Sequence, residues 1–156
     1  MEILFCPWRL LGKQLGENQG NAAAVISATV APEASRLPSI PYVLGVYEDI
    51  DAPIPGRAFS EVDAKAFADF IRGLSSTVDT LYCCCDMAKS RSPAVAAAAC
   101  RYFGKSDRHI WSDPYLYPNM LVFDMLTTAL GIPLTDEEKD ALLQENRAAF
   151  RKAIHK

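Results

Sequence analysis

The chain has 156 residues, of which 50% are hydrophobic and 22% are charged, and its formal net charge at neutral pH is −3. This length and composition predict one domain over residues 1–156 with a single apolar core. The negative net charge excludes a general attraction to nucleic acid or to an anionic membrane surface, so an anionic substrate would require a local basic site.

The cysteine content argues against an extracellular disulfide scaffold. Five cysteines are present and three of them are consecutive, at positions 83–85, where neighbours cannot be bridged without heavy strain. The N-terminal segment carries Glu2 and is interrupted by Pro7 and Arg9, unlike a signal peptide. No apolar stretch is long enough to span a bilayer. We therefore expect a cytoplasmic protein without membrane association.

Four short apolar runs, bounded by Gly, Pro, Asn or Asp, are typical of buried strands. Helical patterns lie between and after them. Strands that alternate with helices predict an α/β fold with a central, mostly parallel sheet of four to five strands and helices on both faces. Ligands bind such sheets at the carboxyl ends of the strands. The four runs are residues 3–6, 23–30, 42–47 and 80–84.

The first two long helices have recognisable starts and stops. Ser60 and Asp63 form a capping-box pattern, and apolar residues then recur at helical spacing as far as Gly73. Residues 92–103 are rich in alanine, with Pro93 in the first turn and Gly104 just past the end. A strand, a loop and a helix therefore follow one another around Cys85.

Two further helices are expected in the C-terminal third. One begins at Asn119 and runs to Gly131, and the last begins at Thr135, where Thr-Asp-Glu-Glu is another capping-box pattern. We expect residues 135–155 to form a C-terminal helix packed on the domain, with docking on a neighbouring molecule as the alternative. Its apolar side chains on one side are Leu142, Leu143, Ala149, Phe150 and Ile154.

Residues 105–118 contain too many Pro, Ser, Asp and aromatic residues for regular structure. A segment of this length without secondary structure is typical of a loop that folds over a functional surface. We expect it to form the wall of a site. Tyr115 and Tyr117 either line that site or fill the loop.

The segment after the fourth strand has the composition of a phosphate cradle. Cys85 ends the strand, five loop residues follow, and Arg91 comes just before the start of the next helix. Loop N–H groups, the positive end of a helix and a guanidinium are the groups that surround a bound oxyanion. We predict that phosphate binds without a metal or other cofactor to Arg91 and to the loop residues Asp86, Met87, Ala88, Lys89 and Ser90.

The same groups favour the thiolate of Cys85, which can attack phosphorus and form a cysteinyl-phosphate intermediate. Arg91 and the loop N–H groups would then stabilise charge on the equatorial oxygens. Ser92 either donates its hydroxyl to the thiolate or caps the helix. Lys89 either adds positive potential at the pocket mouth or is an ordinary surface lysine.

The loop Cys85-Asp-Met-Ala-Lys-Ser-Arg91-Ser92-Pro93 resembles the signature of the cysteine-dependent protein tyrosine phosphatases, Cys-x5-Arg followed by Ser or Thr. It is most similar to their small bacterial and dual-specificity-like members. Residues 43–49, 59–71 and 118–122 resemble elements that flank the loop in that family. The resemblance implies a phosphatase-like fold and hydrolysis of a phosphorylated protein or a small phosphomonoester, without a cofactor.

The family also uses an aspartic acid on an upstream loop to protonate the leaving oxygen. By resemblance that acid is Asp49, which directly follows the expected strand, with Asp51 as the alternative. Two positions depart from the family pattern, because Cys84 replaces a histidine and Ala88 replaces a glycine. If position 88 requires a positive φ, alanine strains the loop. A phosphate-binding pseudophosphatase without turnover is therefore the alternative function.

Other roles for the cysteines stay open. Cys83 and Cys84 would point to opposite faces of the sheet as buried apolar residues. Protection of an oxidised Cys85 by Cys84 or Cys100 is the alternative role. A thiol hydrolase with His109 as its base is a weaker alternative. A metal site on residues 83–85 is disfavoured, because adjacent residues do not converge on one ion.

Overall fold

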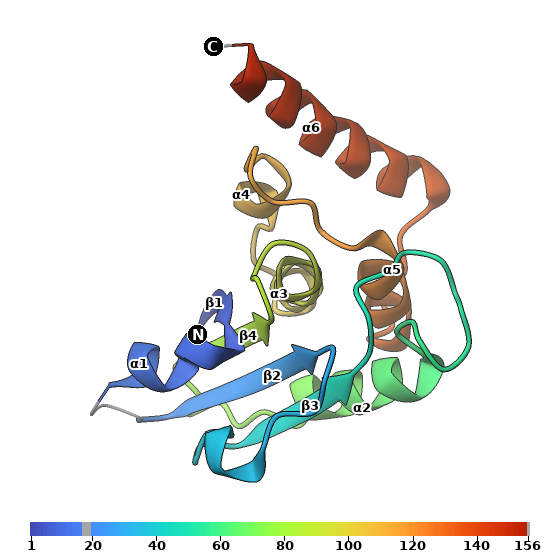
Figure 1. Cartoon of the computed structure of the whole chain (residues 1–156). Coiled ribbons are helices and arrows are strands. Elements are labelled where there is room, and N and C mark those ends of the chain that lie inside the picture. The colour runs from blue at the N-terminus through green and yellow to red at the C-terminus, as the bar shows by residue number, and fades with distance from the viewer. Residues whose placement is uncertain (17–19, 156) are drawn as a thin grey trace.

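The computed structural model describes residues 1–16 and 20–155. Within these residues, four parallel strands form one sheet in the order β1-β4-β2-β3 (Figure 1). Each expected apolar run is a strand, although β2 ends two residues earlier than predicted. The α/β prediction is therefore confirmed. The strands are β1 (Glu2–Pro7), β2 (Ala22–Ala28), β3 (Tyr42–Val46) and β4 (Thr80–Cys85).

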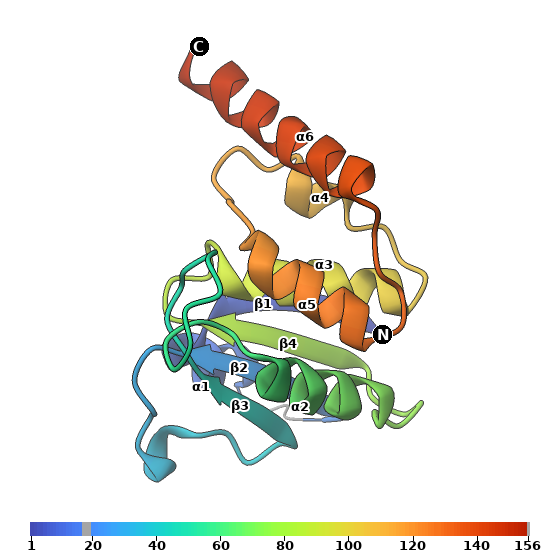
Figure 2. The same ribbon diagram turned by 90° about the vertical axis from the view of Figure 1, so that its right-hand side faces the viewer.

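Helices lie on both faces of the sheet, as predicted. The long helices α2, α3 and α5 pack on one face, and the short η1 and α1 cover the other (Figures 1 and 2). The helical elements are η1 (Trp8–Leu10), α1 (Leu11–Leu15), η2 (Ala34–Arg36), α2 (Glu61–Arg72), α3 (Arg91–Tyr102), α4 (Arg108–Trp111), α5 (Met120–Ala129) and α6 (Asp136–Ile154).

The sheet divides the core into two clusters, where the sequence predicted one. Successive strand residues point to opposite faces, so Val25 and Cys83 face the long helices while Ile26 and Cys84 face η1 and α1. The larger cluster contains the side chains that α2, α3 and α5 direct at the sheet. Among them are Phe67, Ile71, Val95, Phe123 and Leu126.

Three predicted helix starts are confirmed by hydrogen bonds. Ser60 Oγ accepts from the Asp63 N–H at 3.3 Å and the Asp63 carboxylate accepts from the Ser60 N–H at 3.0 Å. Thr135 and Glu138 make the same reciprocal pair at 3.1 and 3.2 Å. Asn119 Oδ1 accepts from the Val122 N–H at 3.1 Å and caps α5. Each side chain thereby satisfies N–H groups that a helix start leaves unpaired.

Residues 105–118 are not entirely irregular, contrary to the prediction, because they contain the short helix α4. Ile110 and Trp111 in α4 are fully buried. Trp111 Nε1 donates to Asp107 at 2.9 Å, and Arg101 from α3 pairs with the same carboxylate at 2.7 Å. The aromatic content that suggested a loop thus belongs to the core, and tertiary burial stabilises a helix too short to be stable alone.

The C-terminal helix α6 lies beyond α4 as seen from the sheet (Figures 1 and 2). Its buried Asn146 donates to the carbonyl oxygens of Trp111 at 3.1 Å and Leu116 at 2.9 Å. Leu142 packs against the larger cluster, whereas Phe150 and Ile154 are exposed. None of the helices in the described ranges has both the length and the apolar character needed to cross a membrane.

Candidate active site

Cys85 is the last residue of β4 and is only 2% exposed, at the point where the chain leaves the sheet and turns into α3. Its Sγ accepts hydrogen bonds from the N–H groups of Ala88 at 3.2 Å and Ser92 at 3.3 Å. The Ser92 hydroxyl lies 3.1 Å from the same sulfur and is hydrogen-bonded to it. Donors of this kind stabilise the charged form of a thiol.

Ser92 therefore does not cap α3, which was one of its two predicted roles. The helix begins at Arg91, and its N-cap residue is Ser90. The Ser92 hydroxyl instead contacts the sulfur of Cys85. A hydroxyl in this position can donate to a thiolate when the sulfur is a leaving group.

Arg91 is only 4% exposed and has two of its nitrogens paired. Nη1 donates to the Tyr47 carbonyl oxygen at 2.7 Å, and Nη2 donates to Asp86 Oδ2 at 2.7 Å. Its Nε is the one buried side-chain nitrogen or oxygen in the described parts of the chain without a hydrogen-bond partner. Buried donors are nearly always paired, so this vacant donor indicates a place for an acceptor.

The Asp86 carboxylate is held on the side of the loop that faces η1 and β2. Trp8 Nε1 and Thr29 Oγ1 each donate to it at 2.8 Å, in addition to Arg91. Burial opposes ionisation of Asp86, but these hydrogen bonds outweigh burial and lower its pKa to about 2. The Asp86 carboxylate is thus an anionic partner of Arg91. Of the groups of Asp86, only the backbone N–H is suited to the phosphate contact predicted for this residue.

The segment before α5 orients the loop peptides. The N–H of Tyr117 donates to the Lys89 carbonyl at 3.0 Å, and the N–H of Asn119 donates to the Ser90 carbonyl at 3.1 Å. Across a trans peptide, the C=O of one residue and the N–H of the next point in opposite directions. The N–H groups of Ser90 and Arg91 are therefore turned away from residues 117–119. The C-terminal end of residues 105–118 thus supports the loop through the hydrogen bond of Tyr117.

Ala88 has a φ of 57°, the one positive φ at a non-glycine position in the described residues. A left-handed backbone costs an L-residue about 1 kcal/mol relative to glycine. The replacement of the family's glycine therefore falls at a position that does require a positive φ. The Ala88 N–H still reaches Cys85 Sγ, so the strained conformation is kept.

Asp49 is joined directly to the loop. Its Oδ1 accepts from the Ser90 hydroxyl at 2.8 Å and from the Asn119 side-chain amide at 2.9 Å. A cavity of about 480 Å³, here called the acid cavity, contains both Asp49 and Asp51. It is lined by Asp49, Asp51, Ser90, Tyr117, Pro118, Asn119, Met120, Leu143, Asn146 and Arg147.

A close aromatic cluster positions the chain upstream of Asp49. Tyr47 and Phe59 pack edge to face with ring centroids 4.9 Å apart, and Phe67 of α2 completes the cluster. A Cβ at Gly45 would lie 2.8 Å from the Phe67 ring, so only glycine allows this approach. The Tyr47 hydroxyl bonds to Ser27 at 2.6 Å. The cluster thereby fixes the carbonyl that receives Arg91.

The other cysteines do not join the site. Cys84 Sγ lies 3.7 Å from Cys6 Sγ on the face covered by η1 and α1, and burial raises the pKa of Cys83 and of Cys100. Among the described residues, no group of three or more His, Cys, Asp and Glu side chains is arranged to hold a metal ion. In the described residues, no hydrogen bond joins the Cys85 sulfur to the sulfur of Cys84 or Cys100, so the protective role is not supported.

His109 also lies elsewhere. It is on α4 and lines a separate cavity together with residues 3–6 of β1. The hydrogen-bond partners of Cys85 are Ala88 and Ser92, and no bond joins Cys85 to His109 within the described chain. A cysteine–histidine hydrolase is therefore not supported.

Several contacts at the site were missed by the sequence reasoning. These are the Tyr47 carbonyl, the Ser90 hydroxyl, the Asn119 amide and the pair Trp8 and Thr29 on Asp86. Asn119 was recognised as a helix start and Ser90 as a residue of the loop, but nothing in the sequence indicated that either contacts Asp49. The remaining residues have no local pattern that distinguishes them from ordinary core or loop residues.

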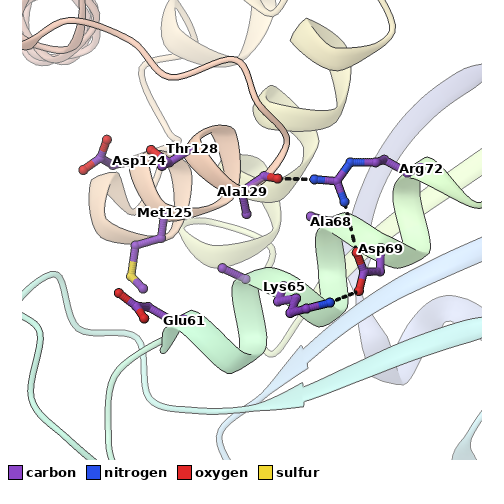
Figure 3. A pocket seen from close by; sticks show the side chains of 10 residues that line it. Glu61, Lys65, Ala68, Asp69, Arg72, Asp124, Met125, Thr128 and Ala129 are labelled. Carbon is purple, nitrogen blue, oxygen red and sulfur yellow. Dashed lines mark hydrogen bonds and ion pairs between the residues drawn. The ribbon is translucent and has the colours of Figure 1, made fainter.

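A second cavity of about 630 Å³ lies between α2 and α5, apart from the loop (Figure 3). Both of its cationic side chains are paired. Lys65 contacts Asp69 at 2.7 Å and Arg72 contacts Asp69 at 3.0 Å. Arg72 also donates to the Ala129 carbonyl of α5 (Figure 3). The remaining charged side chains of the lining, Glu61 and Asp124, are acidic, so this cavity is not suited to an anion.

The parallel sheet and the Cys-x5-Arg loop between β4 and α3 have the arrangement expected of a phosphatase-like α/β protein. No protein-family model matches the chain, and no curated protein matches it. Among solved structures, the chain is similar to human DUSP28, with a TM-score of 0.43 and 15% identity over 97% of this chain and 94% of that one.

A second similar structure is a mouse protein provisionally described as a dual specificity phosphatase, complexed with zinc tungstate. Its TM-score is 0.42, and its identity is 18% over 97% of this chain and 86% of that one. At this level of similarity, we base the functional proposal on the geometry of the site.

Proposed function

We propose that the chain is a phosphomonoester hydrolase that acts through a cysteinyl-phosphate intermediate on Cys85. The observation that carries this proposal is that one loop joins the Cys85 sulfur, which accepts from the N–H groups of Ala88 in the loop and Ser92 at the start of α3, to Arg91, whose buried Nε has no partner. A tetrahedral oxyanion would satisfy the guanidinium and place its phosphorus near the nucleophile. Guanidinium and backbone N–H groups are the usual partners of phosphate.

In the first step, the Cys85 thiolate attacks phosphorus, the sulfur–phosphorus bond forms and the bond to the leaving oxygen breaks. Asp49 in its protonated form gives its proton to that oxygen. The charge that develops on the equatorial oxygens is stabilised by Arg91 and the loop N–H groups. Asp86 acts as a positioning residue, because it holds Arg91 Nη2 at 2.7 Å and keeps the guanidinium at the loop.

In the second step, water attacks phosphorus, and the Asp49 carboxylate accepts the proton that the water loses. The sulfur–phosphorus bond breaks, and phosphate and the thiolate are released. The Ser92 hydroxyl, 3.1 Å from Sγ, donates a hydrogen bond to the leaving thiolate. These steps use only side chains and N–H groups of the loop, its supporting segment and the upstream acid.

The experiment is turnover of p-nitrophenyl phosphate by the wild type, Cys85→Ser and Cys100→Ser. We expect wild-type turnover that persists with a chelator and is inhibited by vanadate. The Cys85→Ser substitution should lower kcat by about 10³-fold or more. Cys100 is a buried cysteine on α3 without contact to the loop, so its variant serves as the matched control. Turnover that survives Cys85→Ser would rule out the nucleophile.

A pseudophosphatase is the second candidate, and the strained Ala88 is the observation that favours it. A distorted loop can bind phosphate yet misplace the transition state, for which small displacements are costly. Calorimetry with tungstate separates the two functions. Anion binding that requires Arg91, together with no turnover by the wild type, would favour the binding protein.

A further inference from the structure

The acid cavity continues into a second hollow of about 580 Å³ between the segment before α5 and the C-terminal helix α6. Tyr117, Asn146 and Arg147 line both hollows, so together they form one groove that begins at Asp49 and Ser90. We call the outer part the aromatic groove. It is lined by Pro114, Tyr115, Leu116, Tyr117, Asn146, Arg147, Phe150 and Arg151.

Three aromatic rings are exposed in the aromatic groove. Tyr115 is 71% exposed, Tyr117 is 60% exposed and Phe150 is 53% exposed. Single exposed apolar residues are common, but several gathered in one hollow indicate a binding surface. Tyrosine and phenylalanine offer large contact areas with few rotatable bonds, which makes them effective anchors for a partner.

The charge at the outer end of the groove is positive. Arg147 and Arg151 are one helical turn apart on α6 and thus lie on the same side of the helix. Neither has an ion-pair partner in the described part of the chain, whereas Arg101 pairs with Asp107 at 2.7 Å and Arg108 with Glu145 at 3.8 Å. Arg151 Nε donates to the backbone carbonyl of Arg147 at 3.5 Å. On a chain with a net charge of −3, two guanidinium groups without an ion-pair partner in one hollow are a local site for an acidic ligand.

We propose that the aromatic groove binds the polypeptide that flanks the phosphorylated residue of a protein substrate. An acidic side chain of that polypeptide contacts Arg147 and Arg151, and an apolar side chain packs on Phe150 and Tyr117. This inference rests on the proposed function of the loop. A phosphomonoester without a polypeptide would contact the loop but would not extend to Phe150 and Arg151, which line only the outer hollow. An extended peptide advances about 3.3 Å per residue and reaches them within a few residues.

The experiment compares two phosphopeptides that differ only in their flanking residues. One carries glutamate and leucine within three positions on either side of the phosphorylated residue, and the other carries lysine and serine there. We expect the wild type to prefer the acidic peptide by about tenfold in kcat/KM, as two partly exposed charge pairs would give. The preference should appear mainly in KM and decline with salt.

The double variant Arg147→Gln/Arg151→Gln should bring the ratio of the two kcat/KM values close to one. Lys152→Gln is the matched control, because it removes an exposed positive charge from α6 outside the groove lining, and it should keep the wild-type ratio. A wild-type ratio near one, or a ratio unchanged in the double variant, would overturn the proposal. Equal kcat/KM for p-nitrophenyl phosphate and the acidic peptide would indicate a small-molecule substrate instead.

Fluorescence anisotropy with the Cys85→Ser variant measures the affinity of each phosphopeptide for the groove in the absence of turnover. If p-nitrophenyl phosphate is hydrolysed but neither peptide ratio nor binding depends on the arginines, the groove proposal fails and the loop proposal stands. If no phosphoester is hydrolysed, arginine-dependent preference for the acidic peptide in binding still supports the groove. Equal binding of both peptides in that case would overturn it.

Discussion

Two regions of the molecule differ in how their cations are paired. Between α2 and α5, Lys65 and Arg72 both pair with Asp69, and Arg72 also reaches the Ala129 carbonyl (Figure 3). At the loop after β4, Arg91 pairs with Asp86 but keeps a buried Nε without a partner.

We infer from this difference that a cation with a donor left over, such as Arg91, is the better candidate for binding an anion. Lys65 and Arg72 already have Asp69 as a partner and gain little from an added anion. A buried donor without an acceptor carries a desolvation cost of about 1 to 3 kcal/mol, which a bound oxyanion can relieve. The predictions below test whether this difference in cation pairing affects activity and stability.

The largest effect is expected from conservative substitution of the two arginines. Arg91→Lys keeps the charge but loses the planar set of donors, so kcat/KM for p-nitrophenyl phosphate should fall by about 10³-fold. Arg72→Lys makes the same change in the cavity between α2 and α5 and should leave kcat/KM within about twofold of the wild-type value. Steady-state kinetics measures kcat/KM, and circular dichroism checks that both variants are folded. Equal losses of kcat/KM in both variants would contradict the distinction between the loop after β4 and the cavity between α2 and α5.

The upstream acids offer the next contrast. Asp49→Asn keeps an acceptor for Ser90 and Asn119 but removes the proton donor, so kcat should fall by about 10²-fold. Asp51→Asn should lower kcat by less than about threefold. Steady-state kinetics of both variants with p-nitrophenyl phosphate makes the comparison. A larger loss in Asp51→Asn would move the acid role to Asp51.

The ion pair of Asp86 should appear in the pH dependence of stability. Its carboxyl pKa in the folded protein is about 2, below the ordinary value, so its stabilising contribution is present above pH ~4 and is lost as the pH falls toward ~2. Allowing for partial solvent exposure, Asp86→Asn should lower the free energy of unfolding by about 1 to 2 kcal/mol at neutral pH.

Urea unfolding of the wild type and Asp86→Asn at several pH values tests this contribution. The difference between the two proteins should shrink as the pH falls from ~4 to ~2. Asp69→Asn, in the exposed ion pair between α2 and α5, is the matched control and should have a smaller effect at neutral pH. A difference for Asp86→Asn that is independent of pH would show that its charge is not the stabilising element.

The smallest effect concerns the strained loop position. Ala88→Gly removes the left-handed strain but adds freedom to the unfolded chain, so the net gain in the free energy of unfolding should be about 0.5 kcal/mol. Ala148→Gly, at an exposed interior position of α6, should instead lose about 1 kcal/mol. Thermal melts give both values. Destabilisation by Ala88→Gly would mean that the positive φ at this position carries no strain.

Much of the fold was predictable because its signals are local. Apolar runs between turn residues placed the four strands, and Ser60, Asn119 and Thr135 marked helix starts through side-chain caps that lie within three residues of their partners. Helix α4 was missed because it forms only when Ile110 and Trp111 are buried by other elements. Tertiary burial of that kind leaves no periodic pattern in four residues.

In the site, as in the fold, the residues with local signals were predictable and the long-range contacts were not. Cys85, Arg91 and Ser92 lie within one loop, so their spacing revealed them. The Asp49 contacts join residues 41 and 70 positions apart along the chain, to Ser90 and Asn119 respectively. Such contacts depend on how β3 and α5 approach the loop, which spacing does not encode. The partners of Asp86 come from η1 and from the end of β2 for the same reason.

Asn146 of α6 holds the carbonyl oxygens of Trp111 and Leu116, in addition to the packing of Leu142 and the ion pair of Glu145 with Arg108. The side chains proposed to select a target lie on α6 and on the segment that it contacts, while the proposed reacting groups follow β3 and β4. On these two proposals, exchange of exposed α6 side chains would alter the choice of target without touching the groups that react.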